Sequence, residues 1–412
     1  MNRRTIPLVP IGAGGPGAVS PPLYFEDGVR SGLVAPPPLS LYIHWPWCVK
    51  KCPYCDFNSH ESAPDEAAYL QALVADLEFA LPDIWGRPVG SIYIGGGTPS
   101  LMSPAGVDAL LAAVRMRVPL QADAEITLEA NPGTAEATHF AGYRAAGVNR
   151  LSLGIQSFDD AKLAALGRIH DGATARAAID MAQRHFARIN LDLMYGLPAQ
   201  SVADAVRDID QALASGVTHL SAYHLTLEPN TAFHHAPPAL PDDDDASRMQ
   251  DEIEARLATA GFVHYETSAF ARGDAHGDNR CRHNVNYWTF GDYLGIGAGA
   301  HGKVSDAFRI RREARHRHPR RYLDGARTGD FVSSRVDVTG SELPGEFMMN
   351  ALRLTDGVSQ ALFTERTGLP WSRIENTVVA GRRQGLLDGA DGRLRPTALG
   401  RRFLNRTIGA FL

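Results

Sequence analysis

The amino-acid sequence predicts an α/β protein, a partial barrel of parallel strands covered by helices, followed by a smaller, mainly helical domain. Three observations lead to this prediction. Short β-rich segments alternate with helical patterns from Ser40 onward. The chain of 412 residues is long enough for one large domain and an accessory one. From Ser341 the pattern becomes helical and then ends in a turn signal.

The elements of the barrel follow from the hydrophobic pattern. The β-rich segments are 41–45, 91–94, 125–130, 150–156, 189–194 and 219–225. The helical patterns are 65–80, 104–118, 135–146, 173–186, 201–214 and 246–260, the last preceded by the acidic run 242–245 that is expected to cap it. Such alternation indicates βαβ units and a parallel sheet. Six units favour a partial (β/α)6 barrel over an open doubly wound sheet, and chemistry in barrels lies at the C-terminal strand ends.

The chain divides into three predicted parts. Residues 1–39 are interrupted by prolines and glycines and are expected to form a flexible tail. Residues 40–302 carry the barrel. Residues 303–412 are expected to hold a linker and an accessory domain, in which two helices joined near Gly368 precede a hairpin signal at 386–394. That order resembles a winged-helix domain.

Two arginine-rich regions raise the question of anionic partners. The first is expected to be a solvated linker, with contact to a propionate or an acidic partner as the alternative; it contains Arg309, Arg311, Arg312, Arg315, Arg317, Arg320 and Arg321. The second lies in the winged-helix-like region and contains Arg382, Arg383, Arg393, Arg395, Arg401, Arg402 and Arg406. A nucleic-acid-binding module is a third functional reading of it. The net charge of −5 and the barrel motifs argue against that reading, so no nucleic-acid partner is expected.

The composition excludes several classes of protein. Hydrophobic residues make up 44% and charged residues 21%, as in ordinary globular proteins, which excludes a wholly disordered chain. No apolar stretch approaches the roughly 20 residues that cross a bilayer, and no apolar segment follows Arg3 and Arg4 as in a secretory signal. Three of the four cysteines fall within eight positions, which indicates a metal site in a reducing compartment. The cytoplasm is therefore the expected location.

The decisive motif is the C-x3-C-x2-C run of Cys48, Cys52 and Cys55 just after a predicted strand. Thiolates are soft ligands that suit iron–sulfur clusters or zinc. Three of them on one loop can hold three corners of a [4Fe–4S] cluster and leave one iron open. The alternative is a structural zinc ion completed by His44 or His60. The spacing favours the cluster.

A glycine run follows the second predicted strand in the sequence GGGTP at 95–99. Glycines there allow backbone amides to approach a ligand closely, because no side chain intervenes. An ordinary tight turn between strand and helix is the alternative.

The cysteine motif followed by GGGTP resembles the radical S-adenosylmethionine (SAM) superfamily. The surrounding segments LYIHWPWC at 41–48 and CPYCDFNSH at 52–60 closely resemble one branch, the HemW-type heme chaperones, often labelled coproporphyrinogen III oxidase-like. The similarity covers about 40–302, with looser similarity to the C-terminus.

This resemblance implies roles for individual residues. The three cysteines would ligate the cluster, and SAM would chelate the open iron. The residues that match the family's contacts to SAM are Tyr42, Tyr54, Gly96, Gly97, Thr98, Glu129, Gln156, Arg168 and Asp192. The implied chemistry is reductive: an electron from a donor protein enters the cluster and breaks a C–S bond of SAM. The assignment stays open between SAM cleavage and SAM binding alone.

Two features separate the chaperone branch from coproporphyrinogen III dehydrogenase, which is the alternative function. The dehydrogenases carry a further cysteine where this chain has Phe57, and their N-terminal extension does not resemble 1–39. Decarboxylase activity is therefore not expected. The segment 283–288 instead matches the heme-binding signature H-N-x-x-Y-W of the chaperones, which assigns His283, Asn284, Tyr287 and Trp288 to heme.

The resemblance thus implies a heme chaperone that delivers heme to an acceptor protein. A respiratory acceptor would bring the chain into peripheral contact with a membrane. Two further residues keep alternative roles: Cys281 is either a small buried hydrophobe or a ligand brought close by folding, and His301 is either a second heme or substrate contact or a structural residue.

Overall fold

The structure is a computed structural model that describes residues 33, 35–133, 137–273, 277–307, 309–389 and 392–412. The predicted tail 1–39 therefore lies almost entirely outside the described residues, as does the start of the helix predicted at 135–146. Across the described residues, every helix is too short or too polar to traverse a bilayer.

The predicted partial barrel is confirmed. The six expected strands are β1 (Leu39–Trp45), β4 (Val89–Gly96), β5 (Leu120–Ala130), β6 (Arg150–Gln156), β7 (Arg188–Tyr195) and β8 (His219–His224). They pair in parallel in that order, and a seventh parallel strand, β11 (Asp292–Ile296), adds to the other side of β1. The sheet does not close, because β14 and β9 remain at its two edges.

Antiparallel strands extend both sides of this parallel core. Beyond β8 lie β10 (Ala269–Ala271) and β9 (Val263–Glu266). Beyond β11 lie β12 (His301–Ser305), β13 (Ile310–Arg315) and β14 (Val332–Asp337). The domain boundary expected after residue 302 falls inside β12, so the large sheet continues along the chain beyond the range predicted for the barrel.

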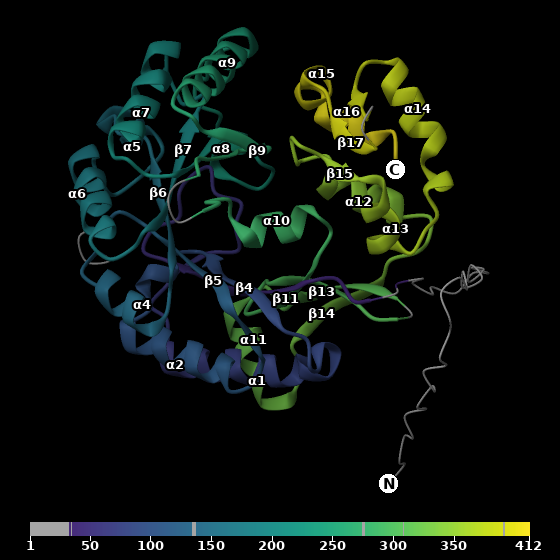
Figure 1. Ribbon diagram of the computed structural model, residues 1–412. Helices are drawn as coiled ribbons and strands as arrows, with labels where there is room; N and C mark the ends of the chain where they lie inside the picture. Colours follow the sequence, from purple (N-terminus) through teal and green to yellow (C-terminus); the bar gives the residue numbers. More distant parts are fainter. Residues whose placement is uncertain (1–32, 34, 134–136, 274–276, 308, 390–391) are drawn as a thin grey trace.

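Helices cover the outer face of the sheet, as Figure 1 shows. They are α1 (Glu66–Ile84), α2 (Pro104–Arg115), α4 (Phe140–Ala146), α5 (Asp160–Ala165), α6 (Gly172–Gln183), α7 (Val202–Ala214) and α9 (Asp243–Thr259), with the short α8 (Ala232–His235) after β8. Several of their starts are capped by side chains: Ser201 and Asp204 form a capping box at α7, and the Asp242 side chain accepts from Asp245 N at α9. The capping role expected of the acidic run is thereby confirmed.

The strands separate an apolar face from a polar one. Leu41, Ile43, Ile92 and Ile94 are fully buried in the core beneath the helices. Each buried side chain of this size contributes about 1.5–3 kcal/mol. Because successive side chains alternate across a strand, the neighbouring positions face the concave side, where buried polar residues gather: Ser91, Glu125, Ser152, Asn190 and Ser221. The inside of this barrel is therefore polar.

The first arginine-rich region belongs to the sheet and is not a solvated linker. It forms β13 and leads into α11 (Pro319–Thr328). Arg315 is buried against Asp76, and Arg311 pairs with Asp83. The sequence alone could not show this, because Asp76 and Asp83 lie on α1, more than 200 positions earlier. Within β13 itself, Glu313 pairs with both arginines.

The C-terminal domain has its own core. It contains α12 (Leu343–Ala351), α13 (Gln360–Thr367), α14 (Glu375–Arg383), α15 (Ala398–Arg402) and α16 (Leu404–Gly409), with the small sheet β15 (Val358–Ser359), β17 (Arg393–Pro396) and β16 (Leu387–Asp388). The predicted hairpin is present as β16 and β17, and α13 ends at Gly368 with φ +72°. One further helix, α10 (Arg282–Trp288), lies between the barrel strands and this domain (Figure 1).

Candidate functional site

A cavity of about 370 Å³ opens at the C-terminal ends of the parallel strands. Its lining includes Cys48, Cys52, Tyr54, Cys55, Gly96, Gly97, Thr98, Glu129, Gln156, Arg168 and Asp192. These are the three cysteines and all but one of the residues that the resemblance assigned to SAM. The exception is Tyr42, whose ring stacks on Tyr93 behind the cavity wall.

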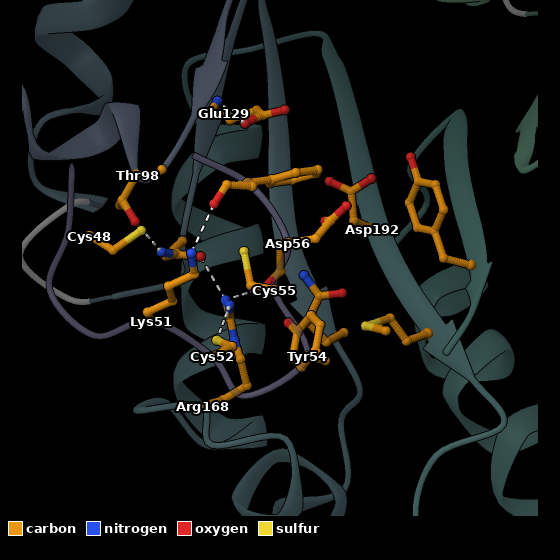
Figure 2. Close-up of a pocket in the computed structure, with 18 of the residues that line it drawn as sticks. Cys48, Lys51, Cys52, Tyr54, Cys55, Asp56, Thr98, Glu129, Arg168 and Asp192 are labelled. Atoms are coloured by element: carbon orange, nitrogen blue, oxygen red, sulfur yellow. Dashed lines mark hydrogen bonds between the residues drawn. The ribbon is translucent and has the colours of Figure 1, made fainter. Parts of the chain in front are cut away.

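The cysteines lie on a loop between two short strands, β2 (Trp47–Cys48) and β3 (His60–Glu61). All three thiols are free and partly exposed. The loop is fastened to the barrel by Asn58, whose side-chain amide donates to Ala298 O at 2.9 Å and to Arg317 O at 2.8 Å. Figure 2 shows Arg168 beside Cys52, with its Nη1 3.6 Å from the sulfur. The guanidinium therefore donates a hydrogen bond to one of the three sulfurs.

The donor set fits a cluster better than a zinc ion. Among the described residues, no group of three or more His, Cys, Asp or Glu side chains converges closely enough to hold a single metal ion. His44 is also engaged at both ring nitrogens, with Tyr42 Oη 2.9 Å from Nδ1 and Asn58 O 2.9 Å from Nε2. Three thiols spread along one wall of a cavity match the three protein ligands of a cubane with one open iron.

The glycine run makes room for the cysteine strand. A Cβ on Gly97 would lie 2.4 Å from Trp47 O, and Gly96 has φ +117° with the His44 ring 2.5 Å from where a Cβ would stand. The amides of Gly97 and Thr98 donate to Trp45 O and Trp47 O, both at 2.7 Å. The glycines bring β4 against the backbone that carries Cys48. This arrangement differs from both expectations for the glycine run, which were amides free to approach a ligand and a simple tight turn.

Glu129 and Asp192 form the acidic side of the cavity, across from the cysteines in Figure 2. Glu129 accepts from Tyr93 Oη at 2.8 Å and from Gly96 N at 3.1 Å. The pKa of Glu129 is raised to about 7, mainly by burial and also by the charge of Asp192, while the hydrogen bonds from Tyr93 and Gly96 N oppose the rise. Burial likewise raises the pKa of Asp192, whose oxygens accept from Ser152 at 2.9 Å and Asn190 at 2.8 Å. A cationic ligand between the two would stabilise both carboxylates.

Arg168 and Gln156 come from the ends of neighbouring segments. Arg168 Nη2 donates to Asn131 Oδ1 at 2.6 Å and to Gly154 O at 2.8 Å. Gln156 has φ +67°, a left-handed conformation that a glutamine rarely adopts, and it follows a register shift between β6 and β7. The irregular strand end places its side chain at the cavity, and such local strain is typical of functional positions.

The sequence reasoning missed several residues of the cavity. Tyr93, Ser152, Met194, Tyr223 and His224 also line it. The available signal was strand alternation: Tyr93 lies an even number of residues from Ser91 and Gly95, so it shares their face. Strand alternation alone does not single out Tyr93, because the sequence does not show which face of the strand lines the concave side.

The four residues assigned to heme lie outside the cavity that holds the cysteines. All lie on α10, and none of them lines the 370 Å³ cavity. His283 is 8% exposed and points toward β4, whereas Trp288 lies against the C-terminal domain with the Arg353 guanidinium 5.1 Å over its ring. Asn284 donates to Glu266 Oε1 at 3.3 Å, and Tyr287 contacts the Tyr293 ring.

Cys281 and His301 lie outside the cavity as well. Cys281 is buried, 3.5 Å from Glu125 Oε1 and 3.4 Å from Asn284 Oδ1, which agrees with the prediction of a small buried residue. His301 is exposed at the start of β12, where its backbone pairs with Ala314 of β13.

Comparison with known proteins assigns this arrangement to a family. Residues 42–212 match the Radical SAM superfamily and residues 338–403 match the HemN C-terminal domain. The heme chaperone HemW of Escherichia coli is 47% identical over 386 residues, which cover 92% of this chain and 100% of that protein. The chain belongs to the HemW family. HemW of Haemophilus influenzae is 44% identical over 91% of this chain and 98% of its own.

A solved structure supports the fold. The chain is similar to coproporphyrinogen III oxidase (HemN) from Escherichia coli, a radical SAM enzyme, with a TM-score of 0.76 and 23% identity over 91% of this chain and 90% of that one. This likeness covers both the barrel and the C-terminal domain, and it concerns the fold alone.

Proposed function

We propose that this protein is a heme chaperone that holds a [4Fe–4S] cluster and SAM in the barrel cavity, binds heme, and transfers it to an acceptor protein. The observation that carries the proposal is the cavity at the strand ends, which has three free thiols on one wall and two buried carboxylates on another. Membership of a family whose named members are heme chaperones supports the heme function.

The cavity residues have separate tasks in this proposal. Cys48, Cys52 and Cys55 would hold the cluster, and Arg168 would orient the Cys52 sulfur through its hydrogen bond. Glu129 and Asp192 would bind the cationic and hydroxyl groups of SAM. Bound together, cluster and SAM supply one-electron reductive cleavage of a C–S bond. The protein positions both groups and limits the access of water, because the cavity is walled by strands on its inner side.

Phe57 supports a chaperone over a coproporphyrinogen III dehydrogenase. It stands where the dehydrogenases have a cysteine, and its side chain is 59% exposed beside the cysteine loop. A phenyl ring at this position offers no thiol for ligation or chemistry. The dehydrogenase function remains the alternative, and formation of protoporphyrinogen IX from coproporphyrinogen III, SAM and a reductant would establish it.

The test begins with anaerobic reconstitution using iron and sulfide. The wild-type protein should show the EPR signal of a reduced [4Fe–4S] cluster, and Cys52→Ala should lose it. Hemin addition should produce a Soret band that is weaker in His283→Ala, and heme should pass to an apo-heme protein. A zinc-loaded protein without a cubane signal, or an unchanged hemin titration in His283→Ala, would contradict the proposal.

A further inference from the structure

Helix α10 packs directly against the wall of the cofactor cavity. The His283 ring lies 5.0 Å from the Tyr93 ring and 6.4 Å from the Tyr42 ring, measured between ring centres. Its Nδ1 is 3.3 Å from the hydroxyl of Ser91, on the same strand as Tyr93. The imidazole therefore fills the space beneath Tyr93.

Tyr93 in turn fixes Glu129. Its hydroxyl donates to Glu129 Oε1 at 2.8 Å, while the other carboxylate oxygen accepts from Gly96 N at 3.1 Å. The Tyr42 ring stacks on Tyr93, with ring centres 6.3 Å apart. One short series of contacts thus leads from α10 to the acidic side of the cavity.

A second branch leads to the cysteine loop. Tyr42 Oη is 2.9 Å from His44 Nδ1, and His44 Nε2 is 2.9 Å from Asn58 O. Asn58 is the residue that fastens the cysteine loop to the barrel. A change in the Tyr42–Tyr93 pair would therefore reach both walls of the cavity.

We propose that Tyr93 is a positioning residue that couples α10 to SAM binding: the His283 ring supports Tyr93, and Tyr93 holds Glu129 in place. This inference rests on the proposed function, in which Glu129 contacts SAM and His283 binds heme. It adds that the two ligands influence one another through a contact already present in the fold.

The coupling between the heme site and the SAM site should be negative, so that each ligand weakens the binding of the other. His283 is enclosed between α10 and β4, so its imidazole must leave Tyr93 in order to ligate an iron outside the barrel. Tyr93 then loses the ring beneath it, and Glu129 loses a fixed donor. Heme at His283 and SAM at Glu129 therefore weaken each other, and linkage makes the effect equal in both directions.

The experiment measures the SAM Kd of the anaerobically reconstituted protein by equilibrium dialysis, without heme. His283→Ala, which removes the supporting ring, and Tyr93→Phe, which removes only the hydroxyl to Glu129, should each raise Kd, about 5- to 20-fold on the usual scale of coupled sites. His283→Phe keeps a ring beneath Tyr93 and should bind SAM within about twofold of wild type. Val285 lies on the same helix but packs against the small apolar cluster of Tyr265, Ala269 and Ala271. Val285→Ala therefore controls for general loosening of α10.

A second readout separates positioning from loss of structure. The Tyr93 bond lowers the pKa of Glu129, so Tyr93→Phe should move the pH dependence of SAM binding upward. The groups that face Glu129 are Tyr93 and the Gly96 amide on β4, Asp192 on β7, Tyr42 on β1 and Tyr223 on β8. Asp192→Asn should move the profile downward, because that charge raises the pKa. Where His283→Ala fails to fold, Tyr93→Phe carries the test, since it deletes a single hydroxyl.

The outcomes are distinguishable from failure of the proposed function. Equal SAM Kd values in wild type, His283→Ala and Tyr93→Phe would overturn the coupling, as would a His283→Phe variant as weak as His283→Ala. Hemin should raise the SAM Kd of wild type but not of His283→Phe. If wild type bound no hemin, the proposed heme function would be wrong, but the SAM Kd values measured without heme would still test the role of Tyr93. If wild type bound no SAM, the proposed function and the coupling would both be wrong.

Discussion

At the scale of single residues, Glu129 shows most clearly how burial disfavours a charged side chain. Its pKa is raised from 4.5 to about 7, mainly because the barrel interior disfavours the ionised carboxylate. In the unfolded chain the same group ionises at its ordinary value. Between these two pKa values the folded protein binds more protons than the unfolded one, so its stability falls as pH rises through this window.

Glu129→Gln should remove that dependence. A glutamine cannot ionise, so the ligand-free variant should gain about 2–3 kcal/mol in unfolding free energy over wild type on going from pH 5 to pH 8, at ~1.4 kcal/mol per pKa unit. Urea unfolding at the two pH values measures this. Glu252→Gln, at an exposed position on α9, should leave the pH dependence as in wild type. Parallel pH profiles for Glu129→Gln and wild type would contradict the argument.

Gly97 is a second position where one atom decides the local structure. Gly97→Ala would bring a Cβ to 2.4 Å from Trp47 O, and that oxygen already accepts from Thr98 N at 2.7 Å. We expect a loss of about 1–3 kcal/mol in unfolding free energy, as for overpacked sites. Iron content after reconstitution should fall too, because Cys48 follows Trp47. Gly340→Ala, with open space around its Cβ, is the control; equal effects would refute the steric explanation.

At the scale of elements, one buried carboxylate on α1 links this helix to β13, to α11 and to the end of β11. Asp76 on α1 accepts from Arg315 Nε on β13 at 2.8 Å, from Tyr322 Oη on α11 at 2.8 Å, and from Gly297 N after β11 at 3.1 Å. Both charged side chains are at most 1% exposed. This cluster fixes the antiparallel extension of the sheet to the first barrel helix.

Asp76→Ala should therefore be strongly destabilising, by about 3–5 kcal/mol, since it removes one partner of a buried ion pair and leaves the Arg315 guanidinium with Glu313 alone. The matched control is Asp251→Ala, which breaks the exposed Asp251–Arg402 pair between α9 and the C-terminal domain and should cost less than about 1 kcal/mol. Urea unfolding measures both. The double variant Asp76→Ala/Arg315→Ala should lose less than the sum of the single variants; strict additivity would count against a direct interaction.

At the scale of the whole molecule, the cavity is the place where distant parts of the chain meet, because its walls come from successive strands between β1 and β8. A ligand that contacts several of these walls binds the folded state and not the unfolded chain. It must therefore raise the stability of the entire barrel.

SAM should stabilise the cluster-loaded protein in a concentration-dependent way, by about 2.7 kcal/mol at 100 times its Kd. Anaerobic thermal unfolding at increasing SAM measures this as a rising Tm. Cys52→Ser, which cannot complete the cluster, should show a much smaller rise. An identical rise in both proteins would place SAM away from the cysteines.

The sequence by itself determined the elements and most of the cavity. Strand positions follow from local hydrophobic patterns, and β6 has the predicted bounds 150–156. The C-terminal ends of parallel strands meet at one edge of any such sheet, so Cys48, Glu129 and Asp192 could be grouped before their distances were known.

The tertiary structure alone decided which side chains support that group. Tyr93 lies opposite Thr127 in the register of β4 and β5, and this pairing brings its hydroxyl to Glu129 two residues further on. Likewise, α10 returns to β4 from nearly 200 positions away, so no local pattern shows that His283 lies beneath Tyr93. Periodicity is a property of neighbours along the chain, whereas these contacts depend on strand register and on the curvature of the sheet, which the complete fold establishes.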